Sequence, residues 1–275
     1  NEIRAKSGLL RGREFLMKDL YSFTKNEAEL TTFYDRMKMA YHNIFKRAGL
    51  GDKTYLTFAS GGVFAKYSHE FQTLCEAGED IIYVSEDKKI AVNREVFTPQ
   101  VLAELGLRQE ELHEAKAIEV GNIFKLGTRF SEALELFYLD QAGKKEPVVM
   151  GSYGLGLDRL LGTIVETLAD AGGIVWPKEV APYQVHLVSL GEDQAVIDEA
   201  DKTYEELIKS GVAVLYDDRR LSAGEKLSDA DLLGMPFRLV ISEKTMAAKQ
   251  LEVKNRQTGQ MKKESLSEFK NRCLK

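Results

Sequence analysis

The stretch Gly151-Ser152-Tyr153-Gly154-Leu155-Gly156-Leu157-Asp158-Arg159 decides the fold class of this chain. It predicts a strand that passes through a glycine-rich turn into a helix, because Leu160, Leu161 and Ile164 follow at helical spacing. Glycines allow close backbone approach, and arginines grouped with carboxylates suit a nucleoside triphosphate and its metal. The third glycine of a dinucleotide fingerprint and any Gly-Lys-Ser/Thr phosphate loop are missing from the sequence, which excludes Rossmann and P-loop readings.

Upstream of this stretch the patterns are mainly those of an antiparallel sheet. Short strands are expected within 116–150 and within 54–86, and a strand pair joined near Ser7-Gly8 is expected within 1–25. A helix is expected from Asn26 to about Gly49, since an Asn cap precedes apolar residues at helical spacing. A polar, mainly helical stretch is expected near 98–114. These elements predict an α+β domain built on an antiparallel sheet.

Beyond Trp176-Pro177 and Pro182 the pattern changes to alternating strands and helices. Strands are expected at 184–190, 212–216 and 237–242, with helices ending near 210 and covering 226–233. Such alternation is typical of an α/β domain. We therefore expect one domain at 1–178 and a second at 179–275.

Composition limits the class of protein. The 275 residues are 44% hydrophobic and 29% charged with a net charge of -5, which suits about two globular domains and a cytoplasmic location. No apolar run approaches the ~20 residues that cross a bilayer. Two distant cysteines and four scattered histidines make a disulfide framework or a zinc site improbable.

Charge is unevenly distributed along the chain. Residues 242–275 carry nine Lys and Arg against four Asp and Glu. This excess suits contact with nucleic acid, but a solvated basic surface is the alternative on charge alone.

Several motifs resemble the class II aminoacyl-tRNA synthetases, most closely the prolyl-tRNA synthetase family. The second motif of the family includes Arg-x-x-x-Phe-x-x-x-Asp, which Arg11, Phe15 and Asp19 fit, and the stretch quoted first fits its third motif, Gly-x-Gly-x-x-Arg. Strings typical of the prolyl branch lie between these motifs: Ser68-His69-Glu70-Phe71-Gln72, Glu76-Ala77-Gly78-Glu79-Asp80 and Leu126-Gly127-Thr128-Arg129-Phe130-Ser131. The resemblance covers essentially the whole chain and implies a class II catalytic domain followed by an α/β anticodon-binding domain.

The resemblance also implies a reaction and its residues. It implies ATP-dependent, Mg²⁺-assisted activation of proline to prolyl-adenylate and transfer to tRNA(Pro). The catalytic residues implied are Arg11, Arg159 and Glu119, with Glu119 also as the Mg²⁺ ligand. The ATP-binding residues implied are Glu2, Arg11, Phe15, Glu119, Asn122, Gly154, Gly156 and Arg159. Those implied for proline are His69, Phe71 and Phe124, and those for the anticodon are Arg219, Lys226, Asp229 and Asp231.

Within these sets the resemblance implies individual roles. Glu2 would accept the adenine amino group, Phe15 would stack on adenine, and Arg11 and Arg159 would hold phosphates. Asn122 stands where bacterial members of the family usually have His. Structural alternatives stay open: the three aromatic residues also suit a core, His69 suits a satisfied buried histidine, and the paired arginines suit surface ion pairs. Asp229 and Asp231 also suit a solvated helix start.

The sequence departs from the family pattern in two respects. The first motif, the Thr-x-Glu element and the second-motif arginine would precede Asn1, so we expect an N-terminally truncated chain that is weakly active or inactive alone, from a full-length homodimer. Only about 30 residues separate Asp87 from Glu119, too few for an editing domain, so we expect no editing insertion. The sequence also shows no long C-terminal extension and no zinc-ligand cluster, which resembles the bacterial or organellar type more than the archaeal and eukaryotic-like branch. The alternatives are a non-catalytic tRNA-binding paralogue and a threonyl- or histidyl-tRNA synthetase.

Overall fold

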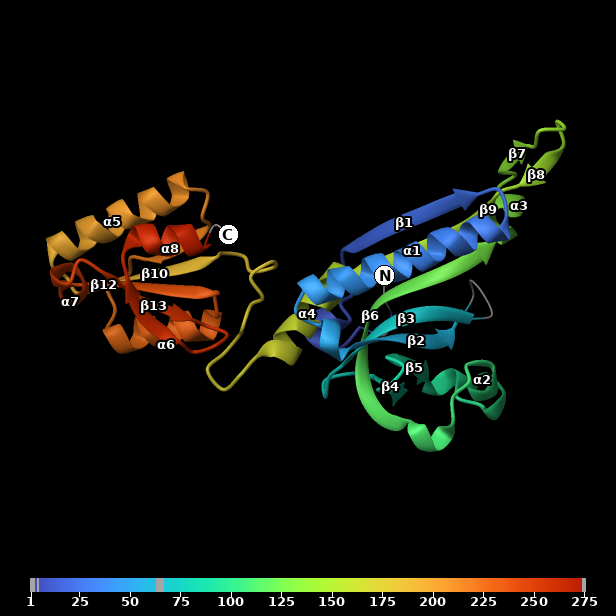
Figure 1. The fold of residues 1–275 in the computed structure, drawn as a ribbon, viewed down its shortest axis with the longest axis horizontal. Helices are drawn as coiled ribbons and strands as arrows, with labels where there is room; N and C mark the ends of the chain where they lie inside the picture. The colour runs from blue at the N-terminus through green and yellow to red at the C-terminus, as the bar shows by residue number, and fades with distance from the viewer. Residues whose placement is uncertain (1–2, 4, 63–66, 274–275) are drawn as a thin grey trace. The chain divides into compact units, whose positions relative to one another are not determined.

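The chain divides between Thr167 and Leu168 into two units, each with its own sheet (Figure 1). The computed structural model describes residues 3, 5–62 and 67–273. Within these residues no helix is both long enough and apolar enough to cross a membrane.

The first unit is built on a seven-stranded sheet in which β6 (His113–Gly127) is the longest strand. Its first residues pair with β4, and the rest pairs with β3 and β9, so β6, β3, β2, β5 and β4 form a closed hydrogen-bonded circuit. Every pairing is antiparallel except that of β2 with β5, which confirms the expected α+β class. The other strands are β1 (Met17–Thr24), β2 (Thr54–Ser60), β3 (Tyr67–Leu74), β4 (Asp80–Ser85), β5 (Ile90–Asn93) and β9 (Val149–Gly156).

Helix α1 (Glu27–Arg47) crosses one face of this sheet (Figure 1). Asn26 caps it by accepting a hydrogen bond from the Glu29 amide at 2.9 Å, as the sequence predicted. The chain leaves the helix through Gly49, whose φ of 76° is the left-handed conformation that favours glycine. The buried side chains that α1 turns toward the sheet are Leu30, Tyr34, Tyr41 and Phe45.

Two expectations for the first unit were wrong in detail. Among the described residues of 1–25 the single strand is β1, and the chain on the two sides of the turn at Ser7 meets only in an antiparallel bridge between Lys6 and Arg11. A 3-10 turn at Gly8–Leu10 precedes β1, and Leu10 packs against Gly162. The stretch 98–114 is helical only at α2 (Pro99–Glu104) and in a short 3-10 turn, since Gly106 takes a φ of 62° that ends the helix. The remaining elements are α3 (Arg129–Ala133), β7 (Phe137–Leu139), β8 (Lys145–Pro147) and α4 (Leu157–Leu168).

The second unit has a five-stranded sheet in the order β11-β10-β12-β13-β14. The first three strands are parallel and the last two antiparallel, which confirms the α/β pattern and extends it. Its strands are β10 (Val185–Leu190), β11 (Val214–Asp217), β12 (Phe237–Ser242), β13 (Leu251–Asn255) and β14 (Met261–Glu264). Its helices are α5 (Gln194–Lys209), α6 (Ala223–Leu233), α7 (Glu243–Ala247) and α8 (Leu266–Cys273).

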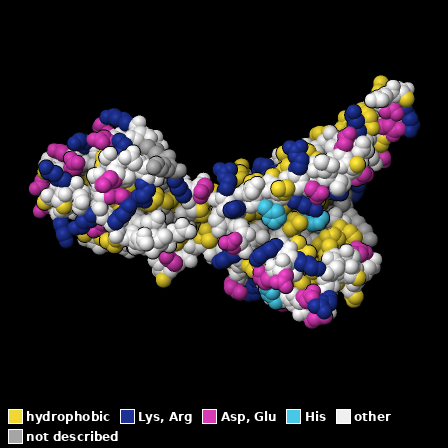
Figure 2. Space-filling view, in the orientation of Figure 1, with side chains coloured by type: hydrophobic (Ala, Val, Ile, Leu, Met, Phe, Trp, Pro, Cys, Tyr) yellow, Lys and Arg dark blue, Asp and Glu magenta, His cyan; other side chains and the backbone are white. Residues whose placement is uncertain are grey.

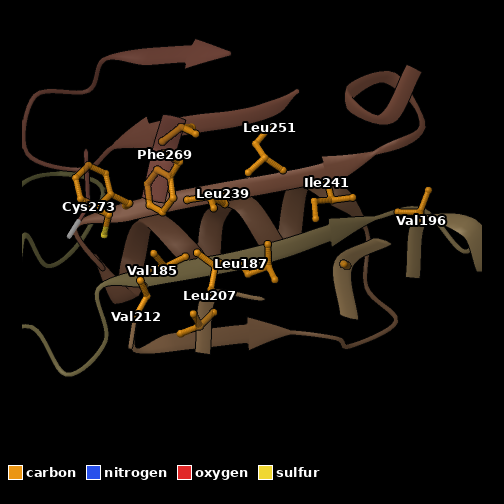
Figure 3. Packing of buried hydrophobic residues seen from close by; sticks show 14 residues of the cluster. Val185, Leu187, Val196, Leu207, Val212, Leu239, Ile241, Leu251, Phe269 and Cys273 are labelled. Atoms are coloured by element: carbon orange, nitrogen blue, oxygen red, sulfur yellow. The ribbon is translucent and has the colours of Figure 1, made fainter. Parts of the chain in front are cut away.

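The basic segment at the end of the sequence is part of this core. Phe269 and Cys273 of α8 are at most 1% exposed and pack with Leu239 and the other residues of the cluster in Figure 3. Several of its basic side chains form ion pairs inside the unit, including Lys254 with Asp231 and Arg256 with Asp170. On the face seen in Figure 2, acidic and basic side chains are interspersed over the unit. Some of the basic side chains of 242–275 therefore form ion pairs within the folded unit.

Gly121, in the middle of β6, is a point of close approach between the sheet and α1. A Cβ at this position would lie 3.0 Å from Tyr41 Cε1 and 3.3 Å from Phe45 Cζ, inside a packed core. We expect Gly121→Ala to lower the free energy of unfolding of the first unit by roughly 1–3 kcal/mol, as overpacking does. Denaturant unfolding followed by far-UV circular dichroism measures the change.

Gly224→Ala is the matched control, because its Cβ would meet nothing closer than Ser222 Oγ at 4.0 Å, within α6. This variant should be as stable as the original chain or more stable. Equal unfolding midpoints for Gly121→Ala and the unsubstituted chain would contradict the close contact.

Candidate functional site

A cavity of about 500 Å³ lies on the face of the first sheet opposite α1. Its floor comes from β1, β6 and β9, and its rim from the segment before β1 and from the start of α4. The structure brings together here most of the residues expected to bind ATP. They are Arg11, Phe15, Glu119, Asn122, Gly154, Gly156 and Arg159, joined by Phe124 from the proline set. Glu2 lies outside the described residues.

A β-bulge places Glu119 and Asn122 on the same face of the sheet. Residues three apart in a regular strand point to opposite faces, but the pairing of β6 with β3 skips Val120, since Gln72 pairs with Glu119 and Phe71 with Gly121. The two side chains consequently meet, and Asn122 Nδ2 donates to Glu119 Oε1 at 2.9 Å. Glycine inside a strand is a known signal of such a bulge.

Arg159 holds the other side of the Glu119 carboxylate. Its NH1 lies 3.2 Å from Glu119 Oε2 and donates to the Glu119 carbonyl at 3.0 Å, while Nε donates to the Leu10 carbonyl at 2.9 Å. Both charged side chains are about one quarter exposed, at 25% each. The guanidinium is thus fixed against two segments. Within the described part of the chain these hydrogen bonds use Nε and NH1, and none of them uses NH2.

Arg11 stands at the cavity rim and forms an ion pair with Glu79 at 3.0 Å. Burial opposes ionisation of Glu79, but hydrogen bonds from Arg11 and Lys6 outweigh it and hold the pKa of that carboxyl below its ordinary value. The Phe15 ring lines the same cavity and is 50% exposed, which leaves a flat apolar face open to a ligand.

Gly154 keeps the cavity floor flat. The side chains of Glu70, Asn122 and Asp19 occupy neighbouring positions across the sheet, and Gly154 lies between the last two. A Cβ there would lie 3.2 Å from Met17 Cε, so a larger side chain would fill the floor. At Gly156 a Cβ would meet Arg159 Cβ at 3.6 Å, an ordinary contact.

The structure does not bring His69 and Phe71 to the cavity. Alternation along β3 points both toward α1, where Phe71 is fully buried and stacks on Tyr41 with ring centroids 5.0 Å apart. His69 Nδ1 lies 2.9 Å from the Tyr34 hydroxyl, which donates to the Ile123 carbonyl at 3.0 Å. Burial, with help from Lys38 and Lys125, lowers the pKa of His69 to about 4 and keeps the ring neutral.

Glu70 and Gln72, the alternate residues of β3, pair with Asn122 and Glu119 of β6, and the sequence motif that contains them indicated no role for either. Gln72 Nε2 donates to Glu70 at 2.9 Å and to Asp80 at 2.7 Å, and Asn93 Nδ2 donates to Glu70 at 3.2 Å. Burial first, and then the charge of Glu119, raises the pKa of Glu70. Gln72 Oε1 and Asn122 Oδ1 are buried without a partner among the described residues. The available signal was the alternation of strand residues, which puts Glu70 and Gln72 on the face opposite to His69 and Phe71.

In the second unit, Arg219 and Asp229 line a cavity of about 410 Å³. Arg219 binds Asp217 through two hydrogen bonds, at 2.9 and 2.7 Å, and its NH2 donates to Asp229 at 2.8 Å. The carboxylate of Asp217 is buried, whereas Arg219 is 51% exposed. Leu215, Leu232 and Leu233 add apolar walls, so the cavity combines a flat charged group with apolar contact surface.

The structure does not bring Lys226 and Asp231 to that cavity. Lys226 is 3% exposed, and its Nζ donates to the carbonyls of Ser189 at 2.9 Å and Asp217 at 3.1 Å. Asp231 accepts hydrogen bonds from Lys254 at 2.8 Å and from Arg238 at 3.1 Å. Both charges therefore hold neighbouring elements of the unit together.

No group of three or more His, Cys, Asp or Glu residues able to hold a metal occurs in the part of the chain that the structure describes. Both cysteines, Cys75 and Cys273, are free thiols. The carboxylates that line the first cavity are Asp19 and Glu119, so a metal there would also need oxygens of a ligand.

Comparison with known proteins agrees with this architecture. Residues 1–168 match the tRNA synthetase class II core domain of the G, H, P, S and T type, and residues 184–275 match an anticodon binding domain. The chain belongs to the class II tRNA synthetases. The resemblance of its motifs to this family is thereby confirmed, as is the order of its two domain types.

Three proteins similar to this chain are all named proline--tRNA ligase. The chain is 36% identical over 274 residues to a proline--tRNA ligase of Rickettsia bellii (strain OSU 85-389), covering 95% of this chain and 63% of the relative. It is 37% identical to that of Caulobacter sp. (strain K31) and 38% identical to that of Wolbachia sp. subsp. Drosophila simulans (strain wRi), each across 98% of this chain. It spans 65% and 66% of the length of those two relatives.

The buried His69 makes the stability of the first unit depend on pH. Folding lowers the pKa of His69 from 6.5 to about 4, so only the unfolded chain takes up this proton as the pH falls between those values. Stability should therefore fall with pH in this window, by on the order of 2 kcal/mol between pH 7.5 and 5 for this group. His69→Gln, which cannot titrate, should lose that much less stability over the same interval.

Far-UV circular dichroism measures both units in denaturant titrations, while fluorescence of Trp176, the only tryptophan, reports the second unit separately. His113→Gln is the control, because the His113 side chain is 51% exposed. The same pH dependence in the unsubstituted and His69→Gln chains would contradict a neutral, buried His69.

Proposed function

We propose that this chain provides the catalytic core and the anticodon-binding domain of a proline–tRNA ligase. The observation that carries the proposal is the single cavity in which two arginines, Glu119 and the exposed ring of Phe15 face a glycine floor. The names of the relatives support proline as the amino acid and tRNA(Pro) as its acceptor. The cytoplasmic location and the homodimer stay predictions.

ATP fits the first cavity by the chemistry of its lining. We propose that adenine stacks on Phe15, whose ring is half exposed, and that Arg11 and Arg159 hold the phosphates. The flat floor at Gly154 lets the ligand approach the backbone of β9. Asn122 offers a buried oxygen without a partner among the described residues, which suits an N–H or O–H donor of the substrate.

Glu119 is the proposed ligand of Mg²⁺. Mg²⁺ in such sites takes one or two carboxylates and completes its shell with phosphate oxygens and water, so one fixed carboxylate fits. When bound, Mg²⁺ would neutralise charge on the triphosphate. Asn122 and Arg159 hold the two oxygens of Glu119 in place, so this carboxylate needs little rearrangement when the ligand arrives.

The chemistry that these residues support is in-line substitution at phosphorus. A carboxylate oxygen of proline forms a bond to the α-phosphorus of ATP, the bond to the bridging oxygen breaks, and pyrophosphate leaves. The 3′-hydroxyl of the terminal tRNA adenosine then attacks the prolyl carbonyl, loses its proton, and AMP leaves. Positioning and charge neutralisation dominate such reactions, which accords with the fixed guanidinium of Arg159.

We propose that proline lies near Phe124, which lines the cavity on β6. His69 and Phe71 would shape this pocket only through the sheet, because both side chains face α1. His69 contacts Tyr34, which in turn bonds the Ile123 carbonyl next to Phe124. Their proposed role is to fix the position of β6.

For the second unit we propose that Arg219 and Asp229 contact unpaired anticodon nucleotides. A guanidinium and a carboxylate can read the donors and acceptors of base edges, and the leucines beside them offer apolar contact. Lys226 and Asp231 would support this surface from within the fold, since their charges are already bonded inside the unit.

A stable analogue of prolyl-adenylate, the prolyl sulfamate of adenosine, tests the first proposal without requiring turnover. By calorimetry, the chain should bind it at least about tenfold more tightly than the threonyl and histidyl analogues, a preference of about 1.4 kcal/mol. Glu119→Gln and Arg159→Lys should each weaken the binding of MgATP. Glu166→Gln, an exposed substitution on α4, should leave both affinities unchanged.

The outcomes separate the alternatives. Preference for the threonyl or histidyl analogue would move the chain to that synthetase. Binding of tRNA with no binding of any analogue, in a folded chain, would instead favour a non-catalytic tRNA-binding protein.

Asp229 and Lys226 should separate recognition from folding. We expect Asp229→Asn to keep the unfolding midpoint, because Asp229 is 41% exposed, and to weaken binding of tRNA(Pro) about tenfold, the size of one base contact. Lys226→Met should lower the stability of the second unit, since it leaves two buried carbonyls without a donor.

Trp176 fluorescence measures the stability of the second unit, because its indole donates to the Leu233 carbonyl of that unit. Filter binding to tRNA(Pro) and to a tRNA with a changed anticodon measures recognition. An Asp229→Asn chain that binds both tRNAs as the unsubstituted chain does would contradict the role of Asp229.

A further inference from the structure

The first turn of α4 holds the segment that carries Phe15. The Leu157 amide donates to the Leu16 carbonyl at 2.9 Å, and Asp158 Oδ2 accepts from the Leu16 amide at 2.7 Å. Both backbone groups of Leu16, the carbonyl and the amide, are thus hydrogen-bonded to the consecutive residues Leu157 and Asp158. One of the two bonds belongs to a side chain, so a substitution can remove it without altering the backbone.

Asp158 is not among the residues that line the cavity, whereas Phe15, next to Leu16, is. The Phe15 ring is 50% exposed and Leu16 is 66% exposed, so packing restrains this segment weakly. Hydrogen bonds to the Leu16 backbone must then supply much of the restraint on the direction of the Phe15 ring. The hydrogen bond that the Leu16 N–H donates to the Asp158 carboxylate is of the stronger, charge-assisted kind.

We propose that Asp158 is a positioning residue that holds the face of Phe15 toward the purine base of ATP. This inference rests on the proposed function, because it requires the base to stack on Phe15. Asp158 itself would touch neither the base nor the phosphates. It acts by fixing the Leu16 amide, and through it the backbone that sets the angle of the ring.

Two substitutions separate this role from the usual effect of an acidic residue at a helix start. Asp158→Ala removes both the charge and the acceptor, whereas Asp158→Asn removes the charge but keeps an oxygen that can accept from Leu16. We expect Asp158→Ala to speed hydrogen exchange in the peptide that contains Leu16 and to weaken ATP binding about tenfold, part of what base–aromatic stacking contributes. Asp158→Asn should restore both to within about twofold.

Glu166→Gln, an exposed substitution on the same helix, is the matched control and should change neither quantity. ATP affinity is measured by calorimetry with MgATP, and unfolding midpoints verify that each variant is folded. Normal ATP affinity in Asp158→Ala, or equal losses in Asp158→Ala and Asp158→Asn, would overturn the role of Asp158. An unsubstituted chain that does not bind ATP would contradict the proposed function itself, and with it the stacking on Phe15.

Discussion

Strand β6 is the constraint on which the first unit depends. It pairs with β3, β4 and β9, and Gly121 at its centre lies under Tyr41 of α1. The bulge at Val120 is the consequence that matters for chemistry, because it turns Glu119 and Asn122 to one face. One extra residue in a strand thus converts two side chains that would point apart into a bonded pair beside Arg159.

Local signals were sufficient to predict the elements that position this site. The glycine-rich strand and the helix after it are β9 and α4, and Asn26 caps α1, because each depends on residues a few positions apart. Gly121 inside the strand is a signal of a bulge, but where the bulge falls was not predictable, since its position depends on how two distant strands pair. The direction of the Phe71 side chain, toward α1, was unpredictable for the same reason. Its motif marked a region of the fold, but only the pairing of β3 decides which residues of that motif face the cavity.

The second unit shows the same limit for charge. A lysine in a motif typical of anticodon-binding domains suggests contact with a polyanion. The Nζ of Lys226 instead donates hydrogen bonds to the carbonyls of Ser189 and Asp217. Likewise, part of the basic excess near the C-terminal end of the sequence is paired with acidic side chains from outside that segment, Lys254 with Asp231 and Arg256 with Asp170. The sequence gives only the number of charged residues. Recognition depends on the charged side chains that remain exposed after folding, such as Arg219.

The arginines of the first cavity illustrate why paired charges still suit a phosphate site. Arg11 and Arg159 each contact a carboxylate, and these contacts hold the guanidinium groups in place before a ligand arrives. The cost of ordering two long side chains is then met in folding and not in binding. The surrounding carboxylates also make the cavity unfavourable for a bare anion, so a triphosphate would gain from entering with its metal. A fixed Glu119 between Asn122 and Arg159 would suit the proposed role as ligand of that metal.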